Sequence, residues 1–102
     1  MTRFDNVSEV IGPSRRLTKP EMARALRLAI ADEYEAVQVY TMIAESTDDE
    51  GIKAVVMDIV KEEQVHASQF WELLAEIDPY EEEAWHKADG ENKELKKRAR
   101  GY

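Results

Sequence analysis

Two long segments of the chain carry hydrophobic residues at the spacing of one helical face. In the first segment these positions are Met22, Leu26, Ile30, Val37, Tyr40 and Ala44. In the second they are Ile52, Val55, Val56, Ile59, Phe70, Leu73 and Ile77. A three-to-four spacing sustained over this length is typical of an amphipathic α-helix. We therefore predict helices over about 19–45 and 48–76.

Capping signals support the start of both helices. Thr18 can cap the first one, and Glu21 three residues later completes a capping box. Thr47 and Glu50 form the same pattern before the second helix, which predicts Thr47 as its cap. Because the turn between the helices is short, we expect them to be antiparallel neighbours.

The C-terminal part of the chain has a weaker pattern. Asp78-Pro79 should stop the second helix, and Pro suits the first turn of another one. We predict a shorter third helix over about 79–88, ended by Asp89-Gly90. The expected organisation is an extended arm over 1–16, a helical hairpin with a third short helix over 17–90, and a polar tail over 91–102. The fold class is all-α.

Three polar residues interrupt the hydrophobic stripes. Glu33 occupies a core position of the first stripe, and Glu63 and His66 occupy core positions of the second. Carboxylates are rarely buried unless they are paired or bind a metal. The three-residue spacing of Glu63 and His66 places both side chains on one face of a helix. The pattern predicts a metal site, and the alternative is a buried salt-bridge cluster.

The types of donor atom indicate which metal the site would bind and how many chains would form it. Carboxylate oxygens with one imidazole nitrogen suit iron or manganese better than a metal that prefers thiolates. Four-helix bundles with two irons take a Glu from each of two helices and a Glu-x-x-His from each of two others. This chain supplies half of that set, so a twofold dimer would supply all of it. A chain of 102 residues also builds only a limited core alone, which favours association.

Composition and charge restrict the function classes. The net charge of −8 disfavours binding to nucleic acid, whose phosphates would be repelled. The absence of Cys excludes disulfides and thiolate metal sites. No apolar run approaches the roughly 18–20 residues that span a bilayer, and no signal peptide is evident at the N-terminus. We therefore expect a cytoplasmic protein without membrane partners.

The segments 32–40 and 61–67, DEYEAVQVY and KEEQVHA, resemble the ferritin-like superfamily. The chain is most similar to the encapsulated ferritins and the short rubrerythrin-like proteins, over about 17–77. The resemblance implies a dimer that completes a ferritin-like four-helix bundle and acts as a ferroxidase, oxidising ferrous iron with oxygen for iron storage or detoxification. It implies two iron ions per dimer, with Glu33, Glu63 and His66 as ligands. Manganese or zinc are the alternative metals.

The resemblance also implies roles for three neighbouring residues. Tyr40 would lie close to the metals, and Asp32 and Glu35 would line the route by which iron reaches them. From the residues alone, Tyr40 is equally compatible with a core aromatic, and a solvated face is favoured for Asp32 and Glu35. Those proteins have a tryptophan before the matching tyrosine, where this chain has Val39.

Three other functions stay open at this point. The first is a rubrerythrin-like peroxidase, which would need an external reductant because the chain has no Cys. The second is a non-catalytic dimer that buffers iron, zinc or manganese, and the third is a structural dimer. The expected partner is a second copy of the chain, assembled further into a ring and, by resemblance, housed in an encapsulin shell. His86 shares no core face with an acid, so we predict a surface role for it.

Overall fold

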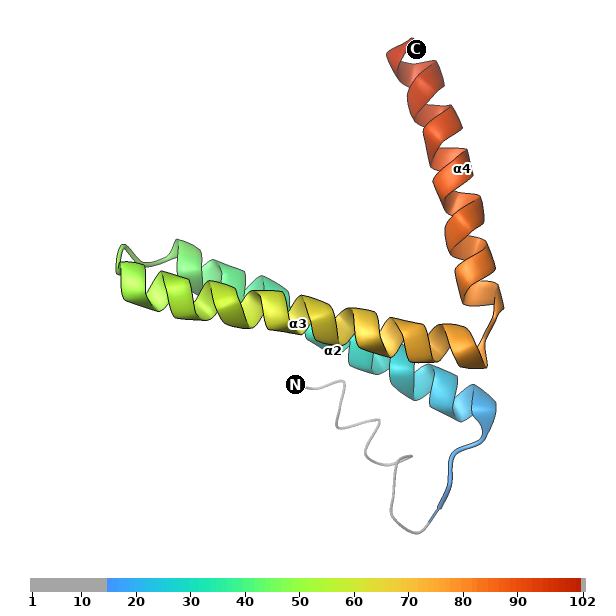
Figure 1. Ribbon diagram of the computed structural model, residues 1–102, viewed down its shortest axis with the longest axis horizontal. Coiled ribbons are helices and arrows are strands. Elements are labelled where there is room, and N and C mark those ends of the chain that lie inside the picture. The colour runs from blue at the N-terminus through green and yellow to red at the C-terminus, as the bar shows by residue number, and fades with distance from the viewer. Residues whose placement is uncertain (1–14, 102) are drawn as a thin grey trace.

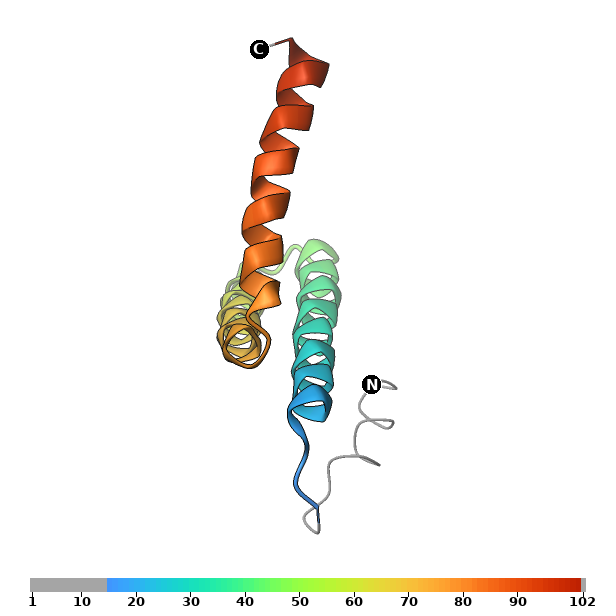
Figure 2. The same cartoon turned by 90° about the vertical axis from the view of Figure 1, so that its right-hand side faces the viewer.

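The computed structural model describes residues 15–101, which form three helices. Helices α2 (Lys19–Glu45) and α3 (Glu50–Ile77) lie side by side and antiparallel, as Figures 1 and 2 show. Helix α4 (Tyr80–Arg100) then leaves the hairpin at a steep angle (Figure 1). The all-α class is confirmed. Residues 1–14 of the predicted N-terminal arm lie outside the described part of the chain.

The predicted capping box starts α2. The Glu21 amide donates to Thr18 Oγ1 at 3.3 Å, and the Thr18 amide donates to Glu21 Oε1 at 2.9 Å. Arg15 adds two hydrogen bonds to the same carboxylate, at 3.0 and 2.7 Å. The Arg15 guanidinium and the Thr18 amide together lower the pKa of Glu21 to about 2. The helix begins and ends at the predicted residues.

The prediction of Thr47 as the cap of α3 is wrong by two residues. Asp49 is the N-cap, and its Oδ1 accepts from the Ile52 amide at 3.1 Å. Thr47 Oγ1 instead accepts from the Asp49 amide at 3.1 Å, which shapes the turn before the helix. Asp and Thr are both good caps, and here the aspartate nearer to the first hydrophobic residue takes the position.

The contact between α2 and α3 follows a regular three-four repeat on both helices. The buried positions are Ala23, Leu26, Ala44, Val60, Ala67 and Leu74. Ile30, Phe70 and Ile77 pack against this core at intermediate positions. Glu33 on α2 and Glu63 on α3 occupy positions of the same repeat, and both are half-buried. The hairpin is therefore a two-helix seam with acids in its middle.

Part of the predicted α3 stripe does not face α2. Ile52, Val55, Ile59 and Leu73 are 47, 62, 37 and 47% exposed, although the sequence pattern predicts them in the core. A single neighbouring helix covers only a narrow strip of another helix, so the rest of a wide stripe stays uncovered. The described chain has a radius of gyration of 17.8 Å, against about 13 Å for a compact domain of this length.

An ion-pair cluster fixes the corner between α3 and α4. Arg27 of α2 contacts Asp78 Oδ2 at 2.8 Å and Glu81 Oε1 at 2.9 Å. Asp78 ends α3, and its Oδ1 accepts from the Tyr80 amide at 3.2 Å. One arginine thus joins the hairpin to the first turn of α4.

Helix α4 is longer than the sequence pattern predicts. The predicted stop at Asp89-Gly90 is wrong, and the helix continues to Arg100, so most of the expected polar tail is helical. Gly90 keeps a helical backbone, whereas Gly101 has φ 77° and closes the helix with a hydrogen bond from its amide to the Lys97 carbonyl. Over residues 15–101, no helix combines the length and apolar composition that crossing a membrane requires.

Candidate metal centre

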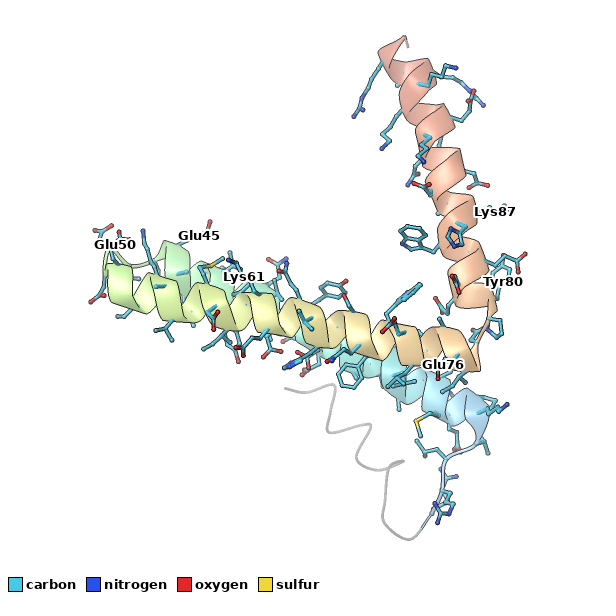
Figure 3. All side chains as sticks on the ribbon, viewed as in Figure 1. Glu45, Glu50, Lys61, Glu76, Tyr80 and Lys87 are labelled. Carbon is cyan, nitrogen blue, oxygen red and sulfur yellow. The ribbon has the colours of Figure 1, made fainter. Side chains whose placement is uncertain are left out.

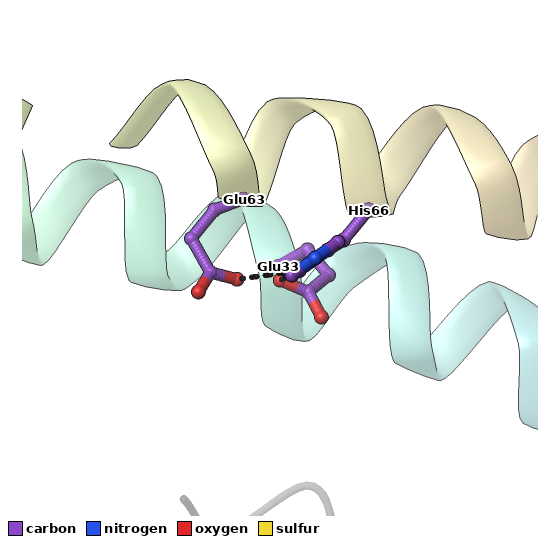
Figure 4. A group of neighbouring side chains, drawn as sticks. All are labelled: Glu33, Glu63 and His66. Atoms are coloured by element: carbon purple, nitrogen blue, oxygen red, sulfur yellow. Dashed lines mark ion pairs between the residues drawn. The ribbon is translucent and has the colours of Figure 1, made fainter. Parts of the chain in front are cut away.

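The fold brings Glu33, Glu63 and His66 together between the two helices of the hairpin (Figure 4). Glu33 comes from α2, whereas Glu63 and His66 come from α3, one turn apart. The three-four repeat explains why these side chains lie close together. Glu33 and Glu63 both occupy positions of the α2–α3 contact, and His66 lies at its edge. The predicted trio is therefore assembled within a single chain.

The distances in the trio are suited to a shared cation. His66 Nδ1 lies 3.8 Å from Glu63 Oε2 and 4.0 Å from Glu33 Oε2. One ligand atom from each residue lies within 4.8 Å of the other two. Two donors that each lie about 2.1 Å from one ion are at most about 4.2 Å apart. The two histidine distances fall within that span and are too long for hydrogen bonds.

Burial makes it costly for the Glu33 carboxylate to have no partner. Its side chain is 18% exposed, and its Oε2 is buried with no hydrogen-bond partner among residues 15–101. Within residues 15–101, neither Glu33 nor Glu63 pairs with a lysine or arginine. A buried carboxylate oxygen without a partner loses its hydration without compensation. A bound cation would supply the missing partner, so the residues fit a metal better than a salt-bridge cluster.

The trio is open on one side. Glu33 and His66 line a hollow that continues along α3 past Gln69, Phe70 and Leu73. The His66 side chain is 50% exposed, whereas the Glu63 side chain is only 21% exposed. Additional ligands can therefore reach the trio from the side of His66.

The other predicted site residues are not in the cluster. Tyr40 is half-buried on α2, about two turns beyond Glu33. Asp32 is half-buried and Glu35 is exposed. Asp32 Oδ1 is buried without a hydrogen-bond partner in the described chain, which the helical pattern did not indicate. The proposed roles of these three residues remain predictions.

His86 has an acidic neighbour, but on a solvated face. Its Nε2 lies 3.6 Å from Glu82 Oε1, one turn earlier on α4, and the two side chains are 65 and 62% exposed. The Trp85 ring lies edge-on to the His86 ring, with 5.3 Å between their centroids. The arrangement agrees with the predicted surface role of His86.

Known proteins share both the sequence and the fold of this chain. The family model described as Rubrerythrin matches residues 24–100. An encapsulin nanocompartment cargo protein of Myxococcus xanthus is 42% identical over 72 residues, which are 71% of this chain and 54% of the relative. A ferritin-like-encapsulin shell fusion protein of Pyrococcus furiosus is 34% identical over 70 residues, 69% of this chain and 20% of the relative. The chain thus spans about half of the first relative and a fifth of the second.

A solved structure has the same architecture. The crystal structure of the encapsulated ferritin domain from Pyrococcus furiosus superposes with a TM-score of 0.78 at 32% identity, over 83% of this chain and 92% of that domain. The family match covers most of the chain: α2 from Arg24 onward, and all of α3 and α4. The chain belongs to the rubrerythrin family of ferritin-like proteins.

Proposed function

We propose that the protein is a ferroxidase that binds two ferrous ions between two copies of the chain and oxidises them with dioxygen. The observation that carries the proposal is the trio of Glu33, Glu63 and His66, in which Glu33 Oε2 is buried without a partner in the part of the chain that the structure describes. Members of this family bind iron, which supports iron as the ion. The carboxylate and imidazole donors have the hardness that ferrous and ferric iron require.

A second copy completes the ligand set. One chain offers two carboxylates and one imidazole, which is half of the set in bundles that hold two irons. The open side of the trio and the exposed apolar residues of α3 lie on the same hairpin, as expected for a surface that another hairpin covers. A twofold axis beside the trio would bring two sets together and bury that surface.

Each residue of the trio has a distinct role in this proposal. Glu33, with one unpartnered oxygen, would bridge the two ions, and Glu63 and His66 would hold one ion from the same side. The two ferrous ions, as substrate, would give one electron each to dioxygen, which would take up two protons from solvent and leave as hydrogen peroxide. The carboxylates would compensate the extra positive charge of the two ferric ions. Tyr40 would lie near the ions, and Asp32 and Glu35 would attract cations toward the open side.

The relatives support a compartment for this activity. One is named as cargo of an encapsulin nanocompartment, and another as a fusion with an encapsulin shell. We infer that this protein also resides in an encapsulin shell, within the cytoplasm. Confinement would retain the oxidised iron that the enzyme produces.

A peroxidase is the second candidate, because the matching family model is that of rubrerythrin. It would use hydrogen peroxide in place of dioxygen and an external reductant to regenerate ferrous iron. Comparing the rates of ferrous oxidation with the two oxidants separates these functions.

Adjacent glutamates of α3 provide a matched test. Glu63→Gln removes a charged ligand, so we expect ferrous oxidation in air to slow by about tenfold or more. Glu62→Gln makes the same chemical change at an exposed position outside the trio and should oxidise iron at the unmodified rate. The rate follows from oxygen consumption after addition of ferrous iron. Equal rates in both variants would contradict the assignment.

A further inference from the structure

A hollow lies between the helical hairpin and the first turns of α4. Figure 3 shows the angle that α3 makes with the segment of α4 from Tyr80 to Lys87. The volume of the hollow is about 560 Å³, which is within the range of sites that bind small organic ligands. Its lining includes no lysine or arginine. The side chains that matter for its chemistry are Tyr34, Ala67, Trp71, Glu82, Trp85 and His86.

Each helix contributes one aromatic ring to the hollow: Tyr34 from α2, Trp71 from α3 and Trp85 from α4. Among residues 15–101, the rings in mutual contact are those of Trp85 and His86, which meet edge-on. The three rings from the three helices therefore line the hollow without stacking on one another. Tyr34 and Trp85 are each 57% exposed, so a ligand between the rings would remove apolar surface from water.

The charge at the hollow is negative. Glu82 supplies the carboxylate of the lining, and within residues 15–101 it forms no ion pair with a lysine or arginine. His86 Nε2 lies 3.6 Å from its Oε1, which is too long for a hydrogen bond. The faces of tryptophan and tyrosine rings also attract cations. The rings and the carboxylate together favour a positively charged ligand, whereas the chain as a whole, at −8, repels anions.

We propose that this hollow binds an organic cation, with an alkylated ammonium group among the three aromatic rings and its charge beside Glu82. Recognition of quaternary ammonium groups by aromatic side chains on several sides is a known use of the cation–π interaction. A metal ion is a poorer ligand for this hollow, because aromatic rings offer no oxygen or nitrogen lone pair to coordinate it. An uncharged apolar ligand would place the Glu82 carboxylate beside an apolar surface without compensation.

A ligand in the hollow would also stabilise the direction of α4. At the corner, Arg27 joins the hairpin to α4 through Asp78 and Glu81. The hollow extends the contact further along α4, to Glu82 and Trp85. A cation that contacts α2, α3 and α4 together therefore adds a second connection between α4 and the hairpin.

The hollow is distinct from the metal centre, since none of Glu33, Glu63 and His66 lines it. Trp71 and Glu82 also border the hollow that opens beside His66, whereas Trp85 does not. A variant of Trp85 therefore distinguishes the two hollows.

Tryptophan fluorescence reports on the hollow directly, because the chain has two tryptophans and both line it. The probe is choline, titrated into the full-length metal-free protein. The control is 3,3-dimethylbutan-1-ol, which has the same shape without the charge. We predict a saturable fluorescence change with choline, and binding of the alcohol that is at least about fivefold weaker.

Three results of this titration would overturn the proposal. Equal affinity for choline and the alcohol would show that the hollow selects apolar bodies rather than cations. The absence of a saturable change with choline would show that it binds no alkylated ammonium group. Choline binding that weakens as the protein concentration rises would show that another copy of the chain fills the hollow.

Variants on α4 test the two parts of the site. Trp85→Leu removes an aromatic face and should weaken choline binding by about tenfold, whereas Trp85→Phe keeps a face and should weaken it less. Glu82→Gln removes the charge and should weaken binding by about fivefold. Glu83→Gln makes the same change one residue along, outside the hollow, and should bind choline normally. Trp71 remains as a fluorophore in every variant, and circular dichroism checks that the helices remain. Equal affinity in all four variants would overturn the proposal.

Discussion

Glu33 and His66 belong to different helices, yet Glu33 Oε2 lies 4.0 Å from His66 Nδ1 (Figure 4). The register of the α2–α3 seam sets this distance, and Glu63 joins the pair from the next turn of α3. The buried Glu33 oxygen has no partner in the described chain, although its neighbours sit in a well-packed seam. We therefore propose that the trio is one half of a metal centre, and the following predictions test this.

Replacing His66 should impair iron chemistry far more than replacing His86. His66→Ala removes the only nitrogen donor of the trio, so we expect ferrous oxidation to slow by at least about tenfold. His86→Ala alters only an exposed neighbour of Glu82 and should leave the rate unchanged. Stopped-flow measurement of ferric iron formation compares them. Equal losses in the two variants would place the site elsewhere.

Iron should strengthen the dimer that builds the metal centre. A metal that binds only the dimer stabilises it by mass action, by about 2.7 kcal/mol at a free metal concentration one hundred times its Kd. Sedimentation of metal-free and iron-loaded protein measures the shift. A monomer in both states would contradict a shared site.

Glu21 should make the stability of the helical hairpin depend on pH in the acidic range. Its folded pKa of about 2 lies below the ordinary 4.5, so its contribution to stability is complete above about pH 4.5 and is lost as the pH falls toward 2. We expect Glu21→Gln to lower the melting temperature at pH 7 and to differ less from the unmodified protein near pH 2. Glu72→Gln, at an exposed position of α3, is the control and should have little effect at either pH. A constant deficit of Glu21→Gln from pH 7 to 2 would exclude this role.

Local signals predicted α2 and the trio well. The Thr18–Glu21 box and the hydrophobic spacing depend on residues within a few turns of one another, so the chain itself displays them. The end of α4 was mispredicted because Asp89-Gly90 resembles a stop signal. A glycine within a helix costs only about 1 kcal/mol. The ion pairs Lys93–Asp89 and Arg98–Glu94 help to offset that cost.

The neighbour that covers each apolar surface could not be predicted in the same way. Periodicity indicates that Ile59 and Leu73 are on an apolar face, but it does not identify the neighbour that covers them. One chain leaves them exposed, as it leaves Trp85 and Leu95 of α4. We expect the proposed roles of Asp32, Glu35 and Tyr40 to depend in the same way on the position of a second chain.

Glu33→Gln separates a metal ligand from a structural acid. The substitution keeps the size of the side chain and replaces a buried charge with a neutral amide, which is less costly to bury without a partner. The metal-free protein should therefore melt at the same temperature or higher. If Glu33 bridges two ions, the same change removes a negative ligand from both, and iron binding should weaken sharply.

Anaerobic ferrous titration of the metal-free protein, followed by exposure to air, tests the central claim most directly. We predict that the unmodified protein binds one ferrous ion per chain, two per dimer, and oxidises them promptly in air. Under the same conditions Glu33→Gln should bind ferrous iron weakly and oxidise it at least about tenfold more slowly. Near-normal oxidation by Glu33→Gln, or no ferrous binding by the unmodified protein, would contradict a two-iron centre built on the trio.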